Sequence, residues 1–278
     1  MAWANRAGAS EVHVLVEDPT SAGILARRAT TFARPPQVWR VDGRALEPAE
    51  PAPSPTFAAP HPAAELEAVL LSDAGLEVVV EQGQVIGELR GLEVARVVIE
   101  PDPSTGLDRP RIEAGVGRFD REQFALMHAD LSPPEAIERV IETVRGYRYA
   151  GAPPHPLNQL VPERWLRAAL VVDPSLVSAA ELRPVESAVP RQNLRENLPA
   201  TAIGTDLDGL PVVVVCSTGV DLELVPTAAD DRLAHFPGAR LVLVVPERDV
   251  ASVTTRLAGA LQQPADVIGV DGDWRGWV

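Results

Sequence analysis

The chain has 278 residues, 46% of them hydrophobic, and a net charge of −14 at pH 7. It therefore has enough apolar side chains for a core, and its composition excludes a globally disordered protein. All 25 of its cationic side chains are arginine, which excludes reactions that need a lysine, such as Schiff-base formation or phosphate binding by a P-loop lysine.

The first elements along the chain predict a short β-α-β unit. Residues 11–16 and 37–41 have the composition of strands, and residues 21–32 between them predict a helix that begins at a threonine or serine cap. Six prolines follow within residues 46–62. Because proline donates no hydrogen bond to a strand ladder, this stretch predicts an extended crossing segment.

A helix and four strands are predicted next. Residues 63–74 predict a helix with Leu66, Val69 and Leu70 on one face and with Gly75 as its stop. The strands predicted after it are residues 76–81, 84–89, 92–99 and 111–116.

Two further helices are predicted in the middle of the chain, at residues 120–128 and 134–148. The second has Pro133 and Pro134 at its start, where proline is favoured. Its apolar stripe consists of Ile137, Val140, Ile141, Val144 and Tyr147.

The last part of the chain has the strongest strand signals. Residues 211–216 and 239–245 predict strands whose continuous apolar runs, at 212–215 and 241–245, are typical of strands covered on both faces of a sheet. The other predicted elements are strands at 201–205 and 266–270 and helices at 226–235 and 250–262. The proline-rich residues 151–195 predict a connecting segment that encloses one short helix at 163–172.

Residues 200–270 combine a hairpin, a buried strand, a helix, another buried strand and a helix, with Asp-Leu-Asp-Gly at residues 206–209 in the first turn. This order resembles the core of the restriction-endonuclease-like (PD-(D/E)xK) nucleases. The resemblance implies an Asp on the first strand and Glu-x-Lys at the end of the second. The carboxylates hold Mg²⁺, and the lysine orients the attacking water.

The positions that would carry this chemistry are occupied by other residues. Ala202 or Ile203 stands at the position of the Asp, and Val215 and Ser217 stand at the positions of the Glu and the Lys. The resemblance therefore implies an inactivated nuclease-like domain that acts as a scaffold or binding domain.

Together the elements predict an α/β protein with two mixed units. Residues 1–150, which include the proline-rich crossing at 46–62, form the first unit, and residues 151–195 connect it to the second unit at 196–278. The second unit is expected to be a sheet flanked by helices, with a restriction-endonuclease-like or Rossmann-like arrangement.

Acidic and arginine side chains gather on the middle strands and on the helix that follows them. The candidate catalytic carboxylates are Glu88, Glu93, Glu113 and Asp120, and the candidate binding residues are Arg96, Arg118 and Arg121. A metal site would need the four carboxylates to converge, because hard cations take several carboxylate oxygens. The alternative is structural: exposed cross-strand ion pairs would account for most of these charges.

Three details favour the structural interpretation. Strand alternation places Glu93 and Arg96 on opposite faces. Gly115 and Gly117 lie between a strand and a helix, as in a phosphate-binding turn, but the charge of Asp120 would repel a phosphate there. Asp120 is instead expected to be a helix N-cap.

The leading hypothesis is a non-catalytic accessory or interaction protein that needs no cofactor and acts through protein partners. Nucleic acid bound locally by arginines is a further hypothesis, which the net charge of −14 disfavours. The alternative is a metal-dependent nuclease or phosphodiesterase with Mg²⁺ in the middle unit. The single cysteine, Cys216, and the lack of a signal-peptide pattern or of an apolar run of about 20 residues predict a cytoplasmic protein without a membrane partner.

Overall fold

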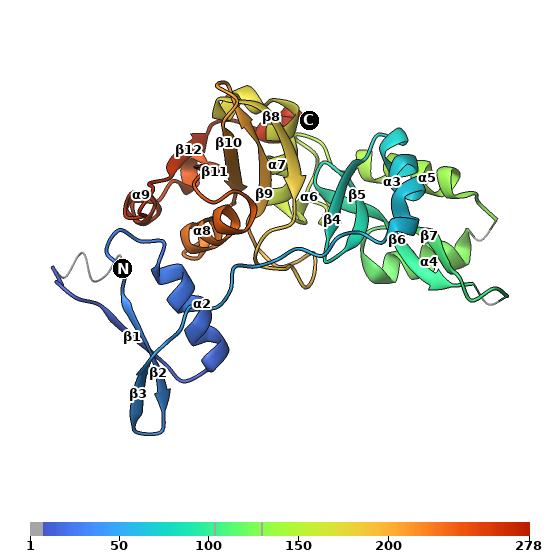
Figure 1. The fold of residues 1–278 in the computed structure, drawn as a ribbon. Coiled ribbons are helices and arrows are strands. Elements are labelled where there is room, and N and C mark those ends of the chain that lie inside the picture. Colours follow the sequence, from blue (N-terminus) through green and yellow to red (C-terminus); the bar gives the residue numbers. More distant parts are fainter. Residues whose placement is uncertain (1–7, 103, 129) are drawn as a thin grey trace.

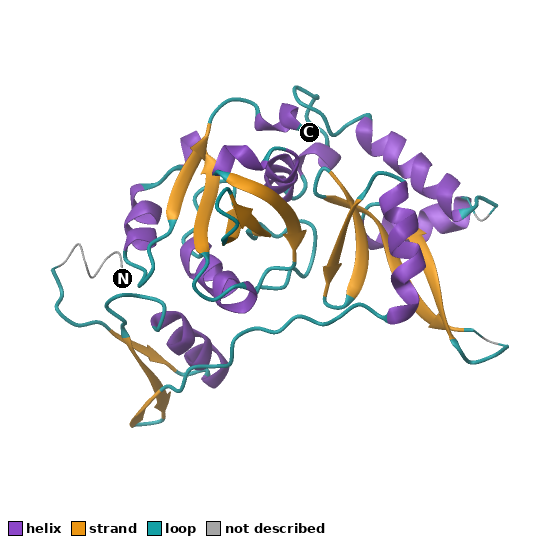
Figure 2. Cartoon of the chain, turned by 45° about the horizontal axis from the view of Figure 1, so that its top comes forward, coloured by secondary structure: helices purple, strands orange, loops and turns teal. Residues whose placement is uncertain are grey.

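The computed structural model describes residues 8–102, 104–128 and 130–278 and contains three β-sheets. A three-stranded sheet near the N-terminus, a four-stranded sheet in the middle and a five-stranded sheet near the C-terminus lie in separate parts of the molecule (Figure 1). Helices flank all three sheets (Figure 2), so the mixed α/β class is confirmed.

The N-terminal unit consists of β1 (His13–Val16), α2 (Pro19–Ala29), β2 (Gln37–Asp42) and β3 (Ala45–Pro48). Strands β1 and β2 are parallel, which confirms the predicted β-α-β unit. The helix begins behind Asp18, whose carboxylate accepts a hydrogen bond from the Ser21 N–H at 2.6 Å, and not behind a threonine or serine. Strand β3, antiparallel to β2, was not predicted.

An extended segment, residues 49–61, runs from the N-terminal unit to the middle unit (Figure 1). It passes along the five-stranded unit, where the ring of Phe57 stacks on that of His235 with 4.3 Å between their centroids. This segment agrees with most of the predicted proline-rich crossing.

The middle sheet is an antiparallel meander of β4 (Glu77–Glu81), β5 (Gln84–Leu89), β6 (Leu92–Pro101) and β7 (Asp108–Ala114). Two-residue turns join β4 to β5 and β5 to β6, and all four turn residues have positive φ. These turns are Gln82-Gly83 and Arg90-Gly91. Positive φ at both positions is characteristic of type I′ turns, which match the right-handed twist of a hairpin.

Helices α3 (Glu65–Asp73) and α5 (Pro133–Arg145) pack on the middle sheet, and α4 (Gly117–Met127) follows β7. On α5 the predicted stripe is buried at Ile137, Val140, Ile141 and Val144, whereas Tyr147 lies beyond the helix and is exposed. The predicted face of α3 is not the one that packs on the sheet. Leu71 is its fully buried side chain, and Leu66, Val69 and Leu70 are exposed.

The five-stranded sheet has the order β12-β11-β10-β9-β8. Its strands are β8 (Ala179–Val185), β9 (Ala200–Asp206), β10 (Pro211–Cys216), β11 (Arg240–Pro246) and β12 (Asp266–Val270). Its helices are α7 (Pro162–Val172), α8 (Leu224–His235) and α9 (Ser252–Gly259), and the short α6 (Pro156–Gln159) precedes them. The sheet therefore begins before residue 196, because α7 and β8 come from the predicted connecting segment.

Both faces of this sheet are buried, as the apolar runs predict. Val213 and Val215 of β10 pack in one core with α8 and residues around α9, while Val212 and Val214 pack in another core with α7. A 3₁₀ turn at Trp274–Trp277 closes the second core, where the ring of Trp274 meets that of Trp165 edge-on at 6.1 Å.

Candidate functional site: buried ion pairs and a cleft on the middle sheet

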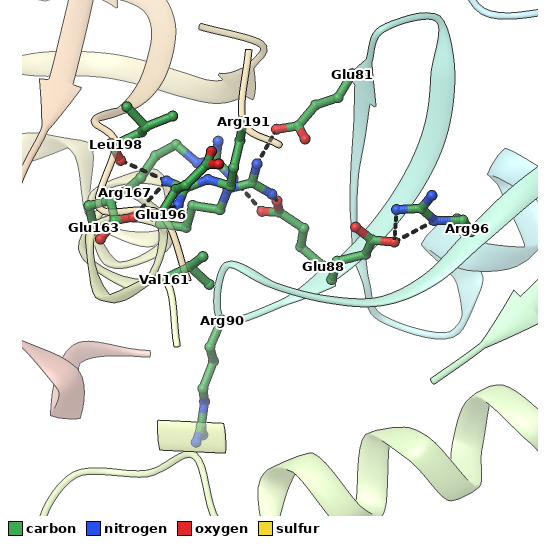
Figure 3. A network of polar contacts seen from close by, with 12 residues as sticks. Glu81, Glu88, Arg90, Arg96, Val161, Glu163, Arg167, Arg191, Glu196 and Leu198 are labelled. Carbon is green, nitrogen blue, oxygen red and sulfur yellow. Dashed lines mark hydrogen bonds and ion pairs between the residues drawn. The ribbon is translucent and has the colours of Figure 1, made fainter. Parts of the chain in front are cut away.

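A buried network of ion pairs joins the middle sheet to α7. Glu88 on β5 is 1% exposed, and its carboxylate contacts Arg164 at 2.7 Å and Arg167 directly. Arg164 also contacts Glu81 of β4 at 2.6 Å. Figure 3 shows Glu81, Glu88 and Arg167 directed toward one another from the two units. Because each Glu88 oxygen already binds a guanidinium group, this carboxylate neutralises buried arginines.

The β5–β6 turn approaches α7 closely enough to require glycine. A Cβ on Gly91 would lie 2.3 Å from the backbone carbonyl carbon and oxygen of Arg164. Gly91 also has φ of +72°, which disfavours other residues. The small turn residue thus permits the helix to bring Arg164 and Arg167 to Glu88.

Arg148 is a third buried arginine at this junction, and the sequence did not point to it. Its guanidinium group donates hydrogen bonds to the carbonyls of Arg90, Leu157 and Leu160 at 2.8–3.0 Å. It also lies 4.4 Å from the centre of the Trp165 ring, at the distance of a cation–π contact. Burial lowers the pKa of Arg148 to about 9, so the group still carries its charge at neutral pH.

Glu93 on β6 forms ion pairs with two other arginines, separate from the Glu88 network. Its Oε1 atom is 2.6 Å from a guanidinium nitrogen of Arg96 and 2.9 Å from one of Arg121, which belongs to α4. The prediction that Glu93 and Arg96 lie on opposite faces is therefore wrong. The pairing changes register between these two residues, since Gly87 pairs with Ala95 and Glu88 with Glu93, and the extra residue Val94 interrupts the strand alternation.

Glu113 and Asp120 also have partners. Glu113 accepts a hydrogen bond from Arg111 at 2.8 Å and lies 3.7 Å from Arg121. Asp120 accepts a hydrogen bond from the backbone N–H of Val116 at 2.7 Å. The N-cap of α4 is Val116, so Asp120 stabilises the helix start from inside the first turn and is not itself the cap.

The Gly115–Gly117 turn serves packing. Gly115 has φ of +137°, and a Cβ there would lie 2.9 Å from the backbone of Arg121. The first turn of α4 therefore folds back against the end of β7 and brings Arg121 to Glu93. Asp120 occupies the helix start, where a phosphate would have to bind.

Six of the seven candidate residues line one open cleft of about 1420 Å³ on the middle sheet. They are Glu93, Arg96, Glu113, Arg118, Asp120 and Arg121. Glu88 lies outside this cleft, in the buried network with α7. The loop between β8 and β9, residues 186–199, is called the strap below. Residues 191–195 of the strap form the far wall of the cleft.

Two buried carboxylates hold the strap in place. Arg191 contacts Glu163 of α7 at 2.6 Å. Asp231 of α8 accepts hydrogen bonds from the Ala188 N–H at 2.5 Å and from the Thr201 hydroxyl at 2.6 Å. Burial raises the pKa of Asp231 to about 6. The far wall of the cleft is thus fixed to the five-stranded unit.

No cluster of three or more His, Cys, Asp or Glu side chains suited to a metal ion occurs within the described ranges. In the five-stranded unit, Ala202, Ile203, Val215 and Ser217 are all buried. Burial also raises the pKa of the Cys216 thiol to about 12, which opposes formation of a nucleophilic thiolate. The side chains at these positions contribute to packing.

Comparisons with protein-family models, with curated proteins and with solved structures gave no match. In the part of the chain that the structure covers, no helix has both the length and the apolar character to cross a membrane.

Proposed function

We propose that this chain is a non-catalytic interaction protein. The observation that carries the proposal is the state of the four candidate carboxylates: Glu88, Glu93 and Glu113 contact arginines, and Asp120 accepts a backbone hydrogen bond at the start of α4. A general base or a metal ligand needs an oxygen directed at the substrate or the ion. Here both oxygens of Glu88 and at least one oxygen of each other candidate carboxylate are directed at the protein's own donors.

The energetics of buried ion pairs support a structural role. Removing one partner of a buried pair leaves an uncompensated charge and costs about 3–5 kcal/mol. Glu88 and Arg167 are both within 1% of full burial, and Glu93 and Arg121 are nearly as enclosed. These groups hold the middle sheet, α4 and α7 in fixed relative positions, which suits a protein that presents a surface to a partner.

The five-stranded unit acts as the scaffold in this proposal. Its hairpin β9–β10, helix α8, strand β11 and helix α9 follow one another in the order on which the nuclease resemblance rests. Valine, alanine and isoleucine at the positions of the expected acids favour an inactivated member of such a fold. Their burial at both faces of the sheet stabilises the unit.

A cleavage assay separates this proposal from the alternative of a metal-dependent nuclease or phosphodiesterase. The full chain is incubated with single-stranded and duplex DNA and with a phosphodiester model substrate, with Mg²⁺, Mn²⁺ or EDTA. We expect no metal-dependent product, and the same result for Glu93→Gln. Metal-dependent cleavage that Glu93→Gln abolishes would refute the proposal.

The interaction itself is tested by affinity capture with the intact chain immobilised. We expect one or a few proteins to be retained in stoichiometric amount after washing at moderate salt, and nucleic acid not to be required. Retention that disappears after nuclease treatment would instead point to binding through DNA or RNA.

A further inference from the structure

Helix α3 carries an uncovered apolar face. Leu66, Val69 and Leu70 are 76%, 52% and 42% exposed, and we call these three residues the α3 stripe. They are spaced at i, i+3 and i+4, so they lie together on one side of the helix. Isolated exposed leucines are common on protein surfaces, whereas contiguous exposed apolar side chains are typical of interaction sites.

The α3 stripe is distinct from the face by which the helix packs on its own sheet. That face uses Leu71, which is fully buried, together with small alanines such as Ala68. Helix α3 contacts all four strands of the middle sheet. The helix thus has two apolar sides, one of which the described chain leaves open to solvent.

The charges that helix α3 itself carries have one sign. Helix α3 carries Glu65, Glu67 and Asp73 and no cation, and Glu65 and Asp73 are exposed next to the stripe. No lysine or arginine occurs from Ala45 to Leu89, a stretch that contains eight acids. Helix α3 therefore contributes only acidic charges beside the stripe, in a chain whose net charge is already −14.

We propose that the α3 stripe is the docking site for an amphipathic helix of a partner protein, whose apolar face is flanked by lysines or arginines. The inference rests on the proposed interaction function and specifies its partner. Apolar residues of the partner would pack between Leu66 and Leu70, as in helix-in-groove recognition, and its cations would approach Glu65 and Asp73.

The same charges argue against two other occupants. A second copy of this chain would bring another −14 and the same acidic border to the contact, and like charges oppose such an approach. An anionic membrane surface would be repelled for the same reason. A basic helix satisfies both the apolar stripe and its border.

Fluorescence anisotropy with a labelled probe tests the proposal on the full chain. The probe is an amphipathic helical peptide of about 18 residues, which is about five turns, built from leucine and lysine. In its counterpart every lysine is replaced by glutamate. We expect the lysine peptide to bind wild type at least about tenfold more tightly than the glutamate peptide does. We expect the same peptide to bind the double variant Leu66→Asp/Val69→Asp at least about tenfold more weakly than it binds wild type.

A matched control is available in the β9–β10 turn. Leu207 is 73% exposed, close to the value for Leu66, and lies in a turn of the five-stranded sheet. Leu207→Asp adds the same charge as one stripe substitution and is expected to leave the affinity unchanged. Circular dichroism and thermal unfolding establish that every variant is folded.

Three results would overturn the inference: equal affinity of the lysine peptide for wild type and the stripe variant, tighter binding of the glutamate peptide, or concentration-dependent dimerisation that the stripe variant abolishes. Anionic vesicles that bind wild type but not the stripe variant would likewise replace the partner helix with a membrane. Affinity capture distinguishes the two levels of failure. If the stripe variant retains the captured protein, the interaction function stands and this docking site is wrong.

Discussion

At the scale of a residue, burial has a clear effect on the pKa of Glu77. It faces Glu88 across the β4–β5 pair, and its Oε2 atom is buried. Desolvation, together with the charge of Glu88, raises the pKa of Glu77 from 4.5 to about 7. The folded state therefore holds this proton more tightly than the unfolded state does, and the free energy of unfolding decreases as pH rises between these two values.

We predict that Glu77→Gln is more stable than wild type at pH 8, by about 1–2 kcal/mol, and close to wild type at pH 4.5. The amide keeps the shape of the side chain and removes the buried charge. Urea unfolding at the two pH values measures the difference. Asp231, with its pKa of about 6, titrates in both proteins, so the comparison isolates Glu77. Equal stabilities at pH 8 would show that Glu77 is well solvated.

The individual candidate residues were partly predictable from the sequence. The predicted strands and helix place six of them on adjacent strands and on the helix that follows, and in the structure these six line one cleft. Their pairing was not predictable. Arg164 and Arg167 lie 76 and 79 residues from Glu88 along the chain, and nothing local in either segment indicates that they meet.

At the scale of the element, α3 shows how the apolar pattern of a helix identifies a face without identifying what covers it. Leu66, Val69 and Leu70 satisfy helical spacing as well as the stripe of α5 does, yet only the α5 stripe packs on the sheet. Short helices with apolar residues on two sides leave this choice to tertiary packing. Strand β8 was missed for a related reason, since proline-rich flanks obscured its apolar pattern.

The orientation of α3 makes a prediction that tests the premise of its docking role. Leu71→Ala removes a fully buried side chain from the middle core and is expected to lower the free energy of unfolding by about 2–4 kcal/mol. Leu66→Ala is expected to change it by less than about 0.5 kcal/mol, because the side chain is exposed. Chemical denaturation of both variants measures this. The reverse order of effects would place Leu66 in the core.

The contact between the β5–β6 turn and α7 gives a second prediction for an element. Gly91→Ala would force a Cβ against the backbone of Arg164 and is expected to cost about 3 kcal/mol or more. Gly43 is the control: its φ is also positive, at +58°, but a Cβ there would meet nothing within 4 Å. Gly43→Ala is therefore expected to cost about 1 kcal/mol. Thermal unfolding that ranks the two variants equally would contradict the close approach.

At the scale of the whole molecule, ion pairs also hold the N-terminal unit. Arg27 and Arg28 of α2 lie 2.9 Å and 2.7 Å from Asp230 of α8, which is 1% exposed. We predict that Asp230→Asn weakens this docking by about 3 kcal/mol or more, because it leaves the largely buried Arg27 without a carboxylate and Arg28 with only the exposed Glu223 as its partner. Faster hydrogen exchange in α2 and faster proteolysis of residues 49–61 would report the effect.

The pair Arg240–Asp266 provides the control for that prediction. The Arg240 Nε and Asp266 Oδ2 atoms are 3.0 Å apart, but the Asp266 side chain is more than half exposed. Exposed pairs contribute at most about 1 kcal/mol, so Asp266→Asn is expected to leave the exchange rate of α2 unchanged. Equal effects of both substitutions would mean that α2 docks through its apolar contacts alone.

The central claim is that the acidic residues of the cleft hold the protein together and do not bind a metal ion. Thermal unfolding of wild type and Glu93→Gln, with excess Mg²⁺ and with NaCl of matched ionic strength, tests it most directly. We predict that Glu93→Gln unfolds roughly 5–10 °C below wild type in both salts, and that Mg²⁺ shifts neither protein relative to NaCl. A Mg²⁺-dependent rise in the unfolding temperature of wild type that Glu93→Gln abolishes would contradict the claim, because only a bound ion stabilises the folded state in this way.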